Sequence, residues 1–206
     1  MTDSALLEAF TSLATSLVGD ALGRLPAARG LRPFHMPGAR TMAGRALTVR
    51  TAAGDNLWIH RALEEVRPGQ VLVVDGEGYA DRALMGEIMV SVAVLRGAHG
   101  LALDGAIRDS ETIRQRALPC YARAVSLRGP YKNGPGAIGV PVCLGGQVVM
   151  PGDLVLGDAD GVIVLPWSDA PTVLDAARKR QADEAAILSG IAEGRYHDAY
   201  AAQEEK

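Results

Sequence analysis

Residues 86–109, GEIMVSVAVLRGAHGLALDGAIRD, constrain the fold more than any other part of the chain. They begin with an apolar segment at 86–96 that has helical spacing, and a short apolar strand at 101–104 follows. We predict that a glycine turn at 105–107 then delivers an adjacent Arg-Asp pair. In an α/β fold, a site usually lies in the loops just beyond the carboxyl ends of strands. The pair is therefore a candidate site.

The chemistry of this pair, Arg108 and Asp109, suits an anion beside a cation. The guanidinium of Arg108 offers a planar fork of donors that matches a carboxylate. Asp109 offers hard oxygen ligands, which Mg²⁺ and Mn²⁺ prefer. A plainer interpretation is a solvated turn in which Asp109 caps the next helix. Spacing alone favours the plainer interpretation.

Length and composition are those of one compact domain, which we place at residues 1–206 with a C-terminal helical arm from about residue 168 and a polar tail. The hydrophobic content of 48% is ample for a core. A net charge of −3 argues against a nucleic-acid binder, which normally presents a basic face. No apolar run reaches the length of a membrane span, and no secretory signal is visible. We therefore expect a cytoplasmic protein.

Several kinds of catalysis lack the residues they need. There is no G-x-S-x-G elbow for a serine hydrolase. Cys120 and Cys143 both lie in apolar contexts, so we predict two reduced core thiols. The few lysines are in a loop, the last helix and the tail, so an imine-forming aldolase has no buried amine. The histidines lack metal-ligand spacing, which argues against zinc; they are His35, His60, His99 and His197.

The remaining elements alternate between helix and strand. We predict two short N-terminal helices within 4–24, the second capped by Thr15 or Ser16. Residues 26–42 are predicted to be mostly irregular, and 126–137 a long loop. Further helices are expected at 56–66, with Asp55 as its cap, at 110–117 and from 168 to about 191. Strands are expected at 45–51, 71–75, 120–125, 138–144, 147–150, 153–157 and 161–165.

Twenty residues separate Glu87 from Arg108-Asp109. This spacing resembles the acidic-x20-Arg-Asp signature of the RraA-like family, which includes the 4-hydroxy-4-methyl-2-oxoglutarate aldolases. Other segments resemble the family in the same order along nearly the whole chain. They are SLVGDALGRL, AGRALTVRT, RPGQVLVVDGEG, LALDGAIRD and VPVCLGGQVVMPGDLVLGDADGVIVLP.

The resemblance implies a layered α/β sandwich of the swivelling β/β/α type, assembled as a homotrimer or as a homohexamer with sites between subunits. Glu184, on the last helix, is a loose match to an acidic residue that family aldolases contribute to a neighbour. A solvated face is the better-supported role for it. The implied partner is a small 2-oxo acid, with no nucleic acid and no membrane.

The resemblance also implies a role for each residue of the site. Asp109 would bind a divalent cation, Mg²⁺ or Mn²⁺, and Glu87 would hold a metal-bound water. Arg108 would bind the substrate and neutralise the enolate charge that develops. Gly86, Glu87, Ile88 and Met89 match the family's substrate-binding run, whose backbone N–H groups would receive a carboxylate. One departure is that Glu87 stands where the signature usually has Asp.

Three hypotheses for function follow. The first is a class II aldolase that cleaves 4-hydroxy-2-oxo dicarboxylic acids to pyruvate, with oxaloacetate decarboxylation as a side activity. The second is a binding protein that inhibits a ribonuclease, although that branch of the family has lost the Arg-Asp pair. The third is a related lyase for another 2-oxo acid. Candidates for a second substrate carboxylate are Arg123, Arg128 and Lys132, for which surface charge is the better-supported alternative.

Overall fold

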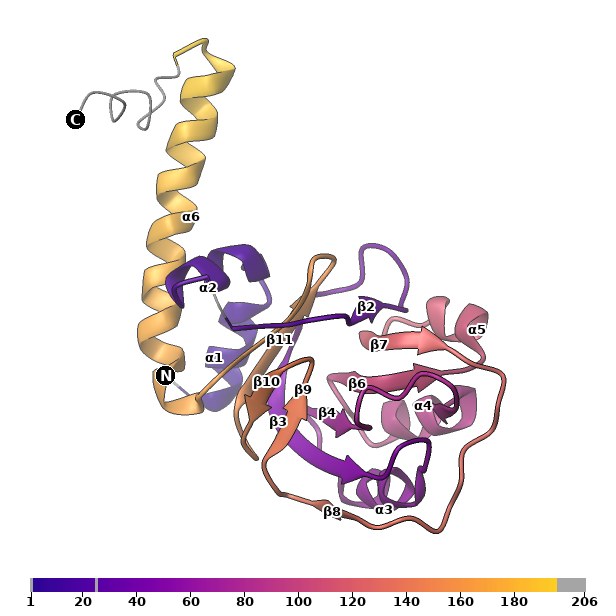
Figure 1. Cartoon of the computed structure of the whole chain (residues 1–206). Helices are drawn as coiled ribbons and strands as arrows, with labels where there is room; N and C mark the ends of the chain where they lie inside the picture. The colour runs from indigo at the N-terminus through magenta and orange to yellow at the C-terminus, as the bar shows by residue number, and fades with distance from the viewer. Residues whose placement is uncertain (1, 25, 196–206) are drawn as a thin grey trace, which may run out of the picture.

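A computed structural model describes residues 2–24 and 26–195 (Figure 1). The helices are α1 (Asp3–Phe10), α2 (Thr15–Ala21), α3 (Leu57–Glu65), α4 (Glu87–Leu95), α5 (Ser110–Arg114) and α6 (Ala170–Ala192), with a 3-10 turn η1 (Trp167–Asp169) before the last. The strands are β1 (Ala27–Ala28), β2 (Arg32–Pro33), β3 (Met42–Thr51), β4 (Gln70–Asp75), β5 (Ala83–Met85), β6 (Gly100–Ile107), β7 (Cys120–Val125), β8 (Gly136–Ile138), β9 (Val142–Leu144), β10 (Gln147–Val149), β11 (Leu154–Asp158) and β12 (Gly161–Leu165).

One large mixed sheet forms the centre of the fold. Its strand order is β1-β12-β11-β3-β4-β6-β7-β2, with β5 paired to β6 and β8 paired to β3. The four central strands β3, β4, β6 and β7 run parallel, so their carboxyl ends meet at one edge. The other pairings in this order are antiparallel, and β9 and β10 form a separate hairpin.

The central strands are buried on both faces, as their continuous apolar sequence predicts. In β4, Leu72 and Val74 pack in the cluster that includes residues of α3 and α4. Val71 and Val73 point to the other face, where they pack with residues of the β9–β10 hairpin. The layers are therefore hairpin, sheet and helices, and the β/β/α sandwich is confirmed.

A second group of helices, α1, α2 and α6, packs against β11 and β12 on the other side of the molecule (Figure 1). Val173, Leu174 and Ala177 are the part of α6 buried there, and the rest of the helix projects away from the body. Arg180 on α6 donates to Asp20 on α2 at 2.8 Å, which ties these helices together. The predicted C-terminal helix is confirmed, while the predicted tail at 196–206 lies outside the described residues.

Two local predictions are wrong because long-range contacts decide them. Residues 105–107 are not a turn, since β6 continues to Ile107 with an irregular register against β7 after Leu103. The second helix is not capped by Ser16 or by its own Thr15 side chain. Instead Asp158, at the end of β11, accepts the Thr15 N–H at 2.8 Å and the Thr15 hydroxyl at 2.7 Å.

The two cysteines differ more than their sequence contexts indicate. Cys120 is fully buried at the start of β7, and this burial raises the pKa of its thiol to about 12. Cys143 is exposed on β9, so the prediction of a core thiol is wrong there. The side chains of β9 alternate, and Val142 and Leu144 take the inward positions.

The long loop after β7 is fixed to the body by one buried carboxylate. Asp55, which is 2% exposed, accepts the backbone N–H groups of Asn133 and Gly134, each at 2.8 Å. Its other oxygen accepts the N–H of Leu57 at the start of α3, at 2.9 Å. A single side chain therefore sets both the first turn of α3, as predicted, and the path of the loop.

Replacing Asp55 with Ala should lower the free energy of unfolding by about 2–4 kcal/mol, because three partly buried N–H groups would lose their acceptor. Asp55→Asn keeps one acceptor oxygen and should cost less. Burial raises the pKa of Asp55, but the three N–H groups outweigh it and hold the pKa below its usual 3.8. The stabilisation is therefore present above pH 4 or so and is lost as the pH falls through the lowered pKa.

Urea unfolding of the wild type and both variants between pH 3 and 7 measures this contribution. Asp55→Ala should flatten the acid dependence as well as lower the stability. Equal stability of the wild type and Asp55→Ala at pH 7 would contradict the anchoring role.

Candidate active site

The predicted site residues meet where two parallel strands end side by side. β5 pairs with β6 so that Met85 lies opposite Ile107. Gly86 directly follows β5 and is the N-cap of α4, while Arg108 and Asp109 directly follow β6. The Arg108 N–H donates to the Met85 carbonyl at 2.9 Å, which fixes the two strand ends together. Strand β5 was not predicted, and this pairing depends on it.

The carboxylate of Asp109 binds the start of α4. Its Oδ2 accepts the Glu87 N–H at 2.9 Å and lies 3.8 Å from Nε of Arg108. Asp109 has a left-handed backbone with φ of 56°, which is uncommon for a residue with a side chain. It occupies the N-cap position of α5 but makes no side-chain cap bond there. The plainer interpretation is therefore correct about the N-cap position of Asp109 and wrong about its side chain, which binds α4 and not α5.

Gly86 leaves the space in which this carboxylate sits. A Cβ at position 86 would lie 2.5 Å from Oδ2 of Asp109 and 3.1 Å from Cγ of Arg108. Any side chain would therefore displace the pair, and the close approach of backbone to carboxylate explains the glycine.

Glu87 is paired with Arg116, an arginine that no sequence motif singles out. Its Oε1 accepts from Nη2 of Arg116 at 3.1 Å, and both side chains are partly exposed. Arg116 lies after α5, so the pairing joins the segments that follow β5 and β6. The Glu87 carboxylate is therefore held by a cation in this chain, and the Glu87 N–H is held by Asp109.

A cavity of about 420 Å³ lies beside Arg108 and Asp109. Of the four residues 86–89, Gly86, Ile88 and Met89 line it, whereas Glu87 does not. The other side chains that matter for its chemistry are Asn56, His60 and Lys132. Asn56 and His60 come from α3 and its cap, and Lys132 comes from the loop that Asp55 anchors.

The polar groups of the cavity wall have fixed roles. Asn56 donates to the Leu84 carbonyl at 2.9 Å, and its Oδ1 is buried without a partner among the described residues. Partial burial, together with the charge of Lys132, lowers the pKa of His60 from its usual value. The arginine and the lysine of the lining are Arg108 and Lys132. In the sequence, only the position of Asn56 and His60 shortly after a predicted strand could have indicated that they belong to the site.

The three candidates for a second carboxylate separate in the structure. Only Lys132 lines the cavity. Arg123 is paired with the buried Asp104, whose other oxygen accepts the Gly145 N–H, so Arg123 has a structural partner. Arg128 is outside the lining, and its carbonyl accepts the Ala83 N–H at 2.9 Å. Glu184 is exposed on α6, beyond Ala177, the last buried residue of that helix.

The surroundings of Asp109 are sparse in metal ligands. Within residues 2–24 and 26–195, no group of three or more His, Cys, Asp or Glu side chains is placed to hold a metal ion. The described lysines, Lys132 and Lys179, are both exposed. None of the helices from α1 to α6 combines the length and apolar character that crossing a bilayer requires.

The β/β/α layers define the class of fold, and the Arg-Asp pair at the strand ends beside a small cavity defines the class of site. Comparison with known proteins agrees. The profile of the RraA-like family, described as Aldolase/RraA, matches residues 15–164. The chain therefore belongs to the RraA-like family.

Two curated relatives carry aldolase names. A protein of Halalkalibacterium halodurans named "Putative 4-hydroxy-4-methyl-2-oxoglutarate aldolase" is 37% identical over 185 residues, which cover 89% of this chain and 87% of that protein. The 4-hydroxy-4-methyl-2-oxoglutarate aldolase of Thermus thermophilus is 37% identical over 129 residues, 63% of this chain and 78% of that protein. The relatives are thus named as carbon–carbon lyases.

Solved structures share the fold. An uncharacterised protein of Pseudomonas syringae has a TM-score of 0.81 at 28% identity, with 94% of each chain covered. RraAS2 of Streptomyces coelicolor, described as an unusual member of the RNase ES inhibitor RraA family, has a TM-score of 0.79 at 28% identity, covering 89% of this chain and 95% of that one.

Gly86→Ala should break the bond between Asp109 and the Glu87 N–H, because the new methyl group takes the place of the carboxylate. We expect a loss of about 1–3 kcal/mol in unfolding free energy, typical of an overpacked position, and a lost hydrogen-bonded shift for the Glu87 amide in NMR spectra. Gly19→Ala in α2, where a Cβ meets only an ordinary 3.4 Å contact, is the matched control. An unchanged Glu87 amide in Gly86→Ala would contradict the geometry.

Proposed function

We propose that the protein is a divalent-metal-dependent aldolase that cleaves 4-hydroxy-2-oxo dicarboxylic acids, such as 4-hydroxy-4-methyl-2-oxoglutarate, to pyruvate. Oxaloacetate decarboxylation is the proposed side activity. The observation that carries this proposal is the bond from the Glu87 N–H to Asp109, which holds a carboxylate next to Arg108 at the mouth of a cavity. The aldolase names of the relatives support the same reaction class.

The donor set fits Mg²⁺ or Mn²⁺ in a water-rich coordination. Asp109 is partly exposed and uses Oδ2 for the Glu87 N–H, so the carboxylate is oriented and accessible. Mg²⁺ keeps several waters and needs only one or two protein carboxylates, so a single well-oriented ligand is sufficient. When bound, such a cation acts as a Lewis acid for a 2-oxo acid. Asp109 is the proposed ligand.

Arg108 and the first turn of α4 are the proposed receptors for the 2-oxo acid. The guanidinium of Arg108 is partly exposed and can make two parallel bonds to a carboxylate. The N–H groups of Ile88 and Met89 lie in the first turn of α4, where no intrahelical acceptor exists. The Glu87 N–H is already engaged by Asp109 and is left out of this set. Negative charge that develops on the substrate would therefore meet a fixed cation and fixed N–H donors.

The second carboxylate of the substrate is assigned to Lys132. It is the remaining cation in the lining, and it is carried by the loop that Asp55 anchors. Arg108 and Lys132, the arginine and the lysine of the cavity lining, are the proposed partners of the two carboxylates.

Assembly into a homotrimer or homohexamer is part of the proposal. Ile88 and Leu95 on α4 are 78% and 82% exposed, and Ile187, Leu188 and Ile191 form an exposed apolar group on the projecting part of α6. Such faces favour contact with other copies of the chain. Glu184 could reach a site only in another copy. The cytoplasm is the proposed compartment, since both cysteines are free.

A ribonuclease-inhibiting role is the second candidate, because a solved neighbour at 33% identity is described as the RNA-processing inhibitor RraA of Thermus. The retained Arg108-Asp109 pair favours the aldolase, as does the cavity beside it. A stable complex with a ribonuclease together with catalytic silence would reverse this order. A lyase for another 2-oxo acid would keep the same Arg108 and Asp109 roles and differ at Lys132.

Pyruvate release from 4-hydroxy-4-methyl-2-oxoglutarate tests the proposal. We expect turnover with Mg²⁺ or Mn²⁺, its loss with a chelator, and its loss in Asp109→Ala with the fold retained. Asp160→Ala, which removes an exposed turn carboxylate on another part of the molecule, is the control and should keep full activity. No turnover with any divalent metal, or near-normal activity of Asp109→Ala, would refute the aldolase proposal.

Glu87 provides a finer test, because the usual signature has Asp there. Glu87→Asp should change kcat by about tenfold or less, as expected for a group that acts through water. Glu87→Ala should cost more and alter the acidic limb of the pH profile. The pair with Arg116 predicts that circular dichroism and unfolding change little in either variant, since both side chains are partly exposed. Unchanged rate and metal affinity in Glu87→Ala would leave Glu87 with no part in catalysis.

A further inference from the structure

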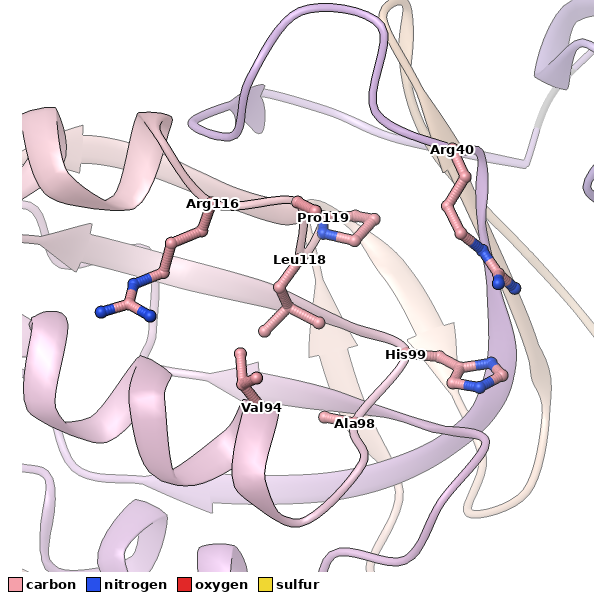
Figure 2. A pocket seen from close by; sticks show the side chains of 8 residues that line it. Arg40, Val94, Ala98, His99, Arg116, Leu118 and Pro119 are labelled. Atoms are coloured by element: carbon pink, nitrogen blue, oxygen red, sulfur yellow. The ribbon is translucent and has the colours of Figure 1, made fainter.

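Figure 2 shows a second cavity, which shares no lining residue with the cavity beside Arg108 and Asp109. It encloses about 420 Å³, which is within the usual range for small-molecule sites. Its walls come from the residues just before three strands, with Arg40 before β3, His99 before β6 and Pro119 before β7. These are the amino ends of the parallel strands, whereas the candidate active site is at their carboxyl ends. The two cavities are therefore distinct.

The floor of this cavity is apolar. Val94 near the end of α4, Ala98 in the turn after it and Leu118 before β7 supply most of it. Figure 2 shows the Val94 and Leu118 side chains directed toward each other between the two ends of the cavity. Val94 is 47% exposed, so the floor is open to a ligand from solvent. An apolar group would bury this surface.

One end of the cavity carries an uncompensated positive charge. Arg40 makes no side-chain hydrogen bond or ion pair with any of residues 2–24 or 26–195. His99, on the same side in Figure 2, uses Nδ1 to donate to the Ala43 carbonyl at 3.1 Å, which fixes its ring beside Arg40. Arg116, at the other end, is already paired with Glu87. Arg40 is therefore the group that an anion would meet.

The neighbouring cavity on the far side of Arg40 and His99 is different in charge. It is larger, about 720 Å³, and Asp3 and Glu8 line it together with Arg45 and Arg67. Arg45 there already pairs with Asp3 at 3.1 Å. Among the residues that the structure describes, none that lines the 420 Å³ cavity carries a carboxylate, so no described wall carboxylate would repel an anion there.

We propose that this cavity binds a small carboxylate with an apolar body. The carboxylate pairs with Arg40 beside His99, and the apolar body covers Val94, Ala98 and Leu118. The fork of the guanidinium matches a carboxylate, and an apolar floor adds affinity that a free inorganic anion would not gain. The proposal concerns binding alone and does not depend on the reaction at Arg108 and Asp109.

Titration of the full chain with benzoate, followed by ¹H–¹⁵N NMR, tests it. Saturable shifts should centre on the amides of Ala98 and His99. Arg40→Ala should weaken benzoate binding by at least about tenfold, because it removes a charge-assisted pair. Arg178→Ala, which removes an exposed arginine of α6 outside the cavity, should leave binding unchanged.

Ligand and floor variants separate charge from apolar contact. Benzamide, which lacks the charge, and acetate, which lacks the apolar body, should each bind more weakly than benzoate. Val94→Asp should abolish binding by repulsion, whereas the neutral Val94→Asn should only weaken it. Failure to saturate, shifts centred on Arg108, or equal binding by the wild type and Arg40→Ala would overturn the proposal.

Discussion

The hydrogen bond between the Glu87 N–H and the Asp109 carboxylate is the contact on which the candidate site depends. It joins the start of α4 to the end of β6 at 2.9 Å, across residues that are distant in sequence. Three conditions make it possible: β5 ends beside β6, Gly86 leaves room, and Asp109 adopts a left-handed backbone. The same contact orients Asp109 beside Arg108 and takes one N–H from the first turn of α4. A carboxylate, a cation and the remaining N–H donors thus lie together beside one small cavity.

Because the central strands are parallel, one edge of the sheet is formed by their carboxyl ends and the opposite edge by their amino ends. The central strands place their carboxyl ends together, with Asp109, Arg108 and Lys132 around one cavity. Their amino ends are also together, and Arg40 and His99 border a cavity of similar volume there. Helix α4 runs from one cavity toward the other, since Glu87 begins it and Val94 lies near its end. Arg116 lines the second cavity and holds Glu87, so it is the side chain that contacts both regions.

Much of the fold was predictable because it depends on local patterns. Continuous apolar runs gave β4 and the start of β6, and both N-terminal helices and the long α6 followed from periodicity and spacing. The predictions that failed depend on partners far away in the chain. Asp158 caps α2, β5 exists only through its pairing with β6, and Cys143 faces out because its neighbours on β9 face in. The site followed the same rule: the Arg108-Asp109 pair was found from its motif, whereas Asn56, His60 and Arg116 required the fold.

The most direct test of the site is a crystal structure of the full chain with Mg²⁺ and oxalate, which imitates the enolate of pyruvate. We predict the cation on Asp109, and oxalate between Arg108 and the N–H groups of Ile88 and Met89. The bond from the Glu87 N–H to Asp109 should remain in place. Binding of the cation and oxalate away from Asp109 and Arg108 would contradict this account. So would a structure in which the Asp109 carboxylate binds the cation only after it has lost its hydrogen bond to the Glu87 N–H.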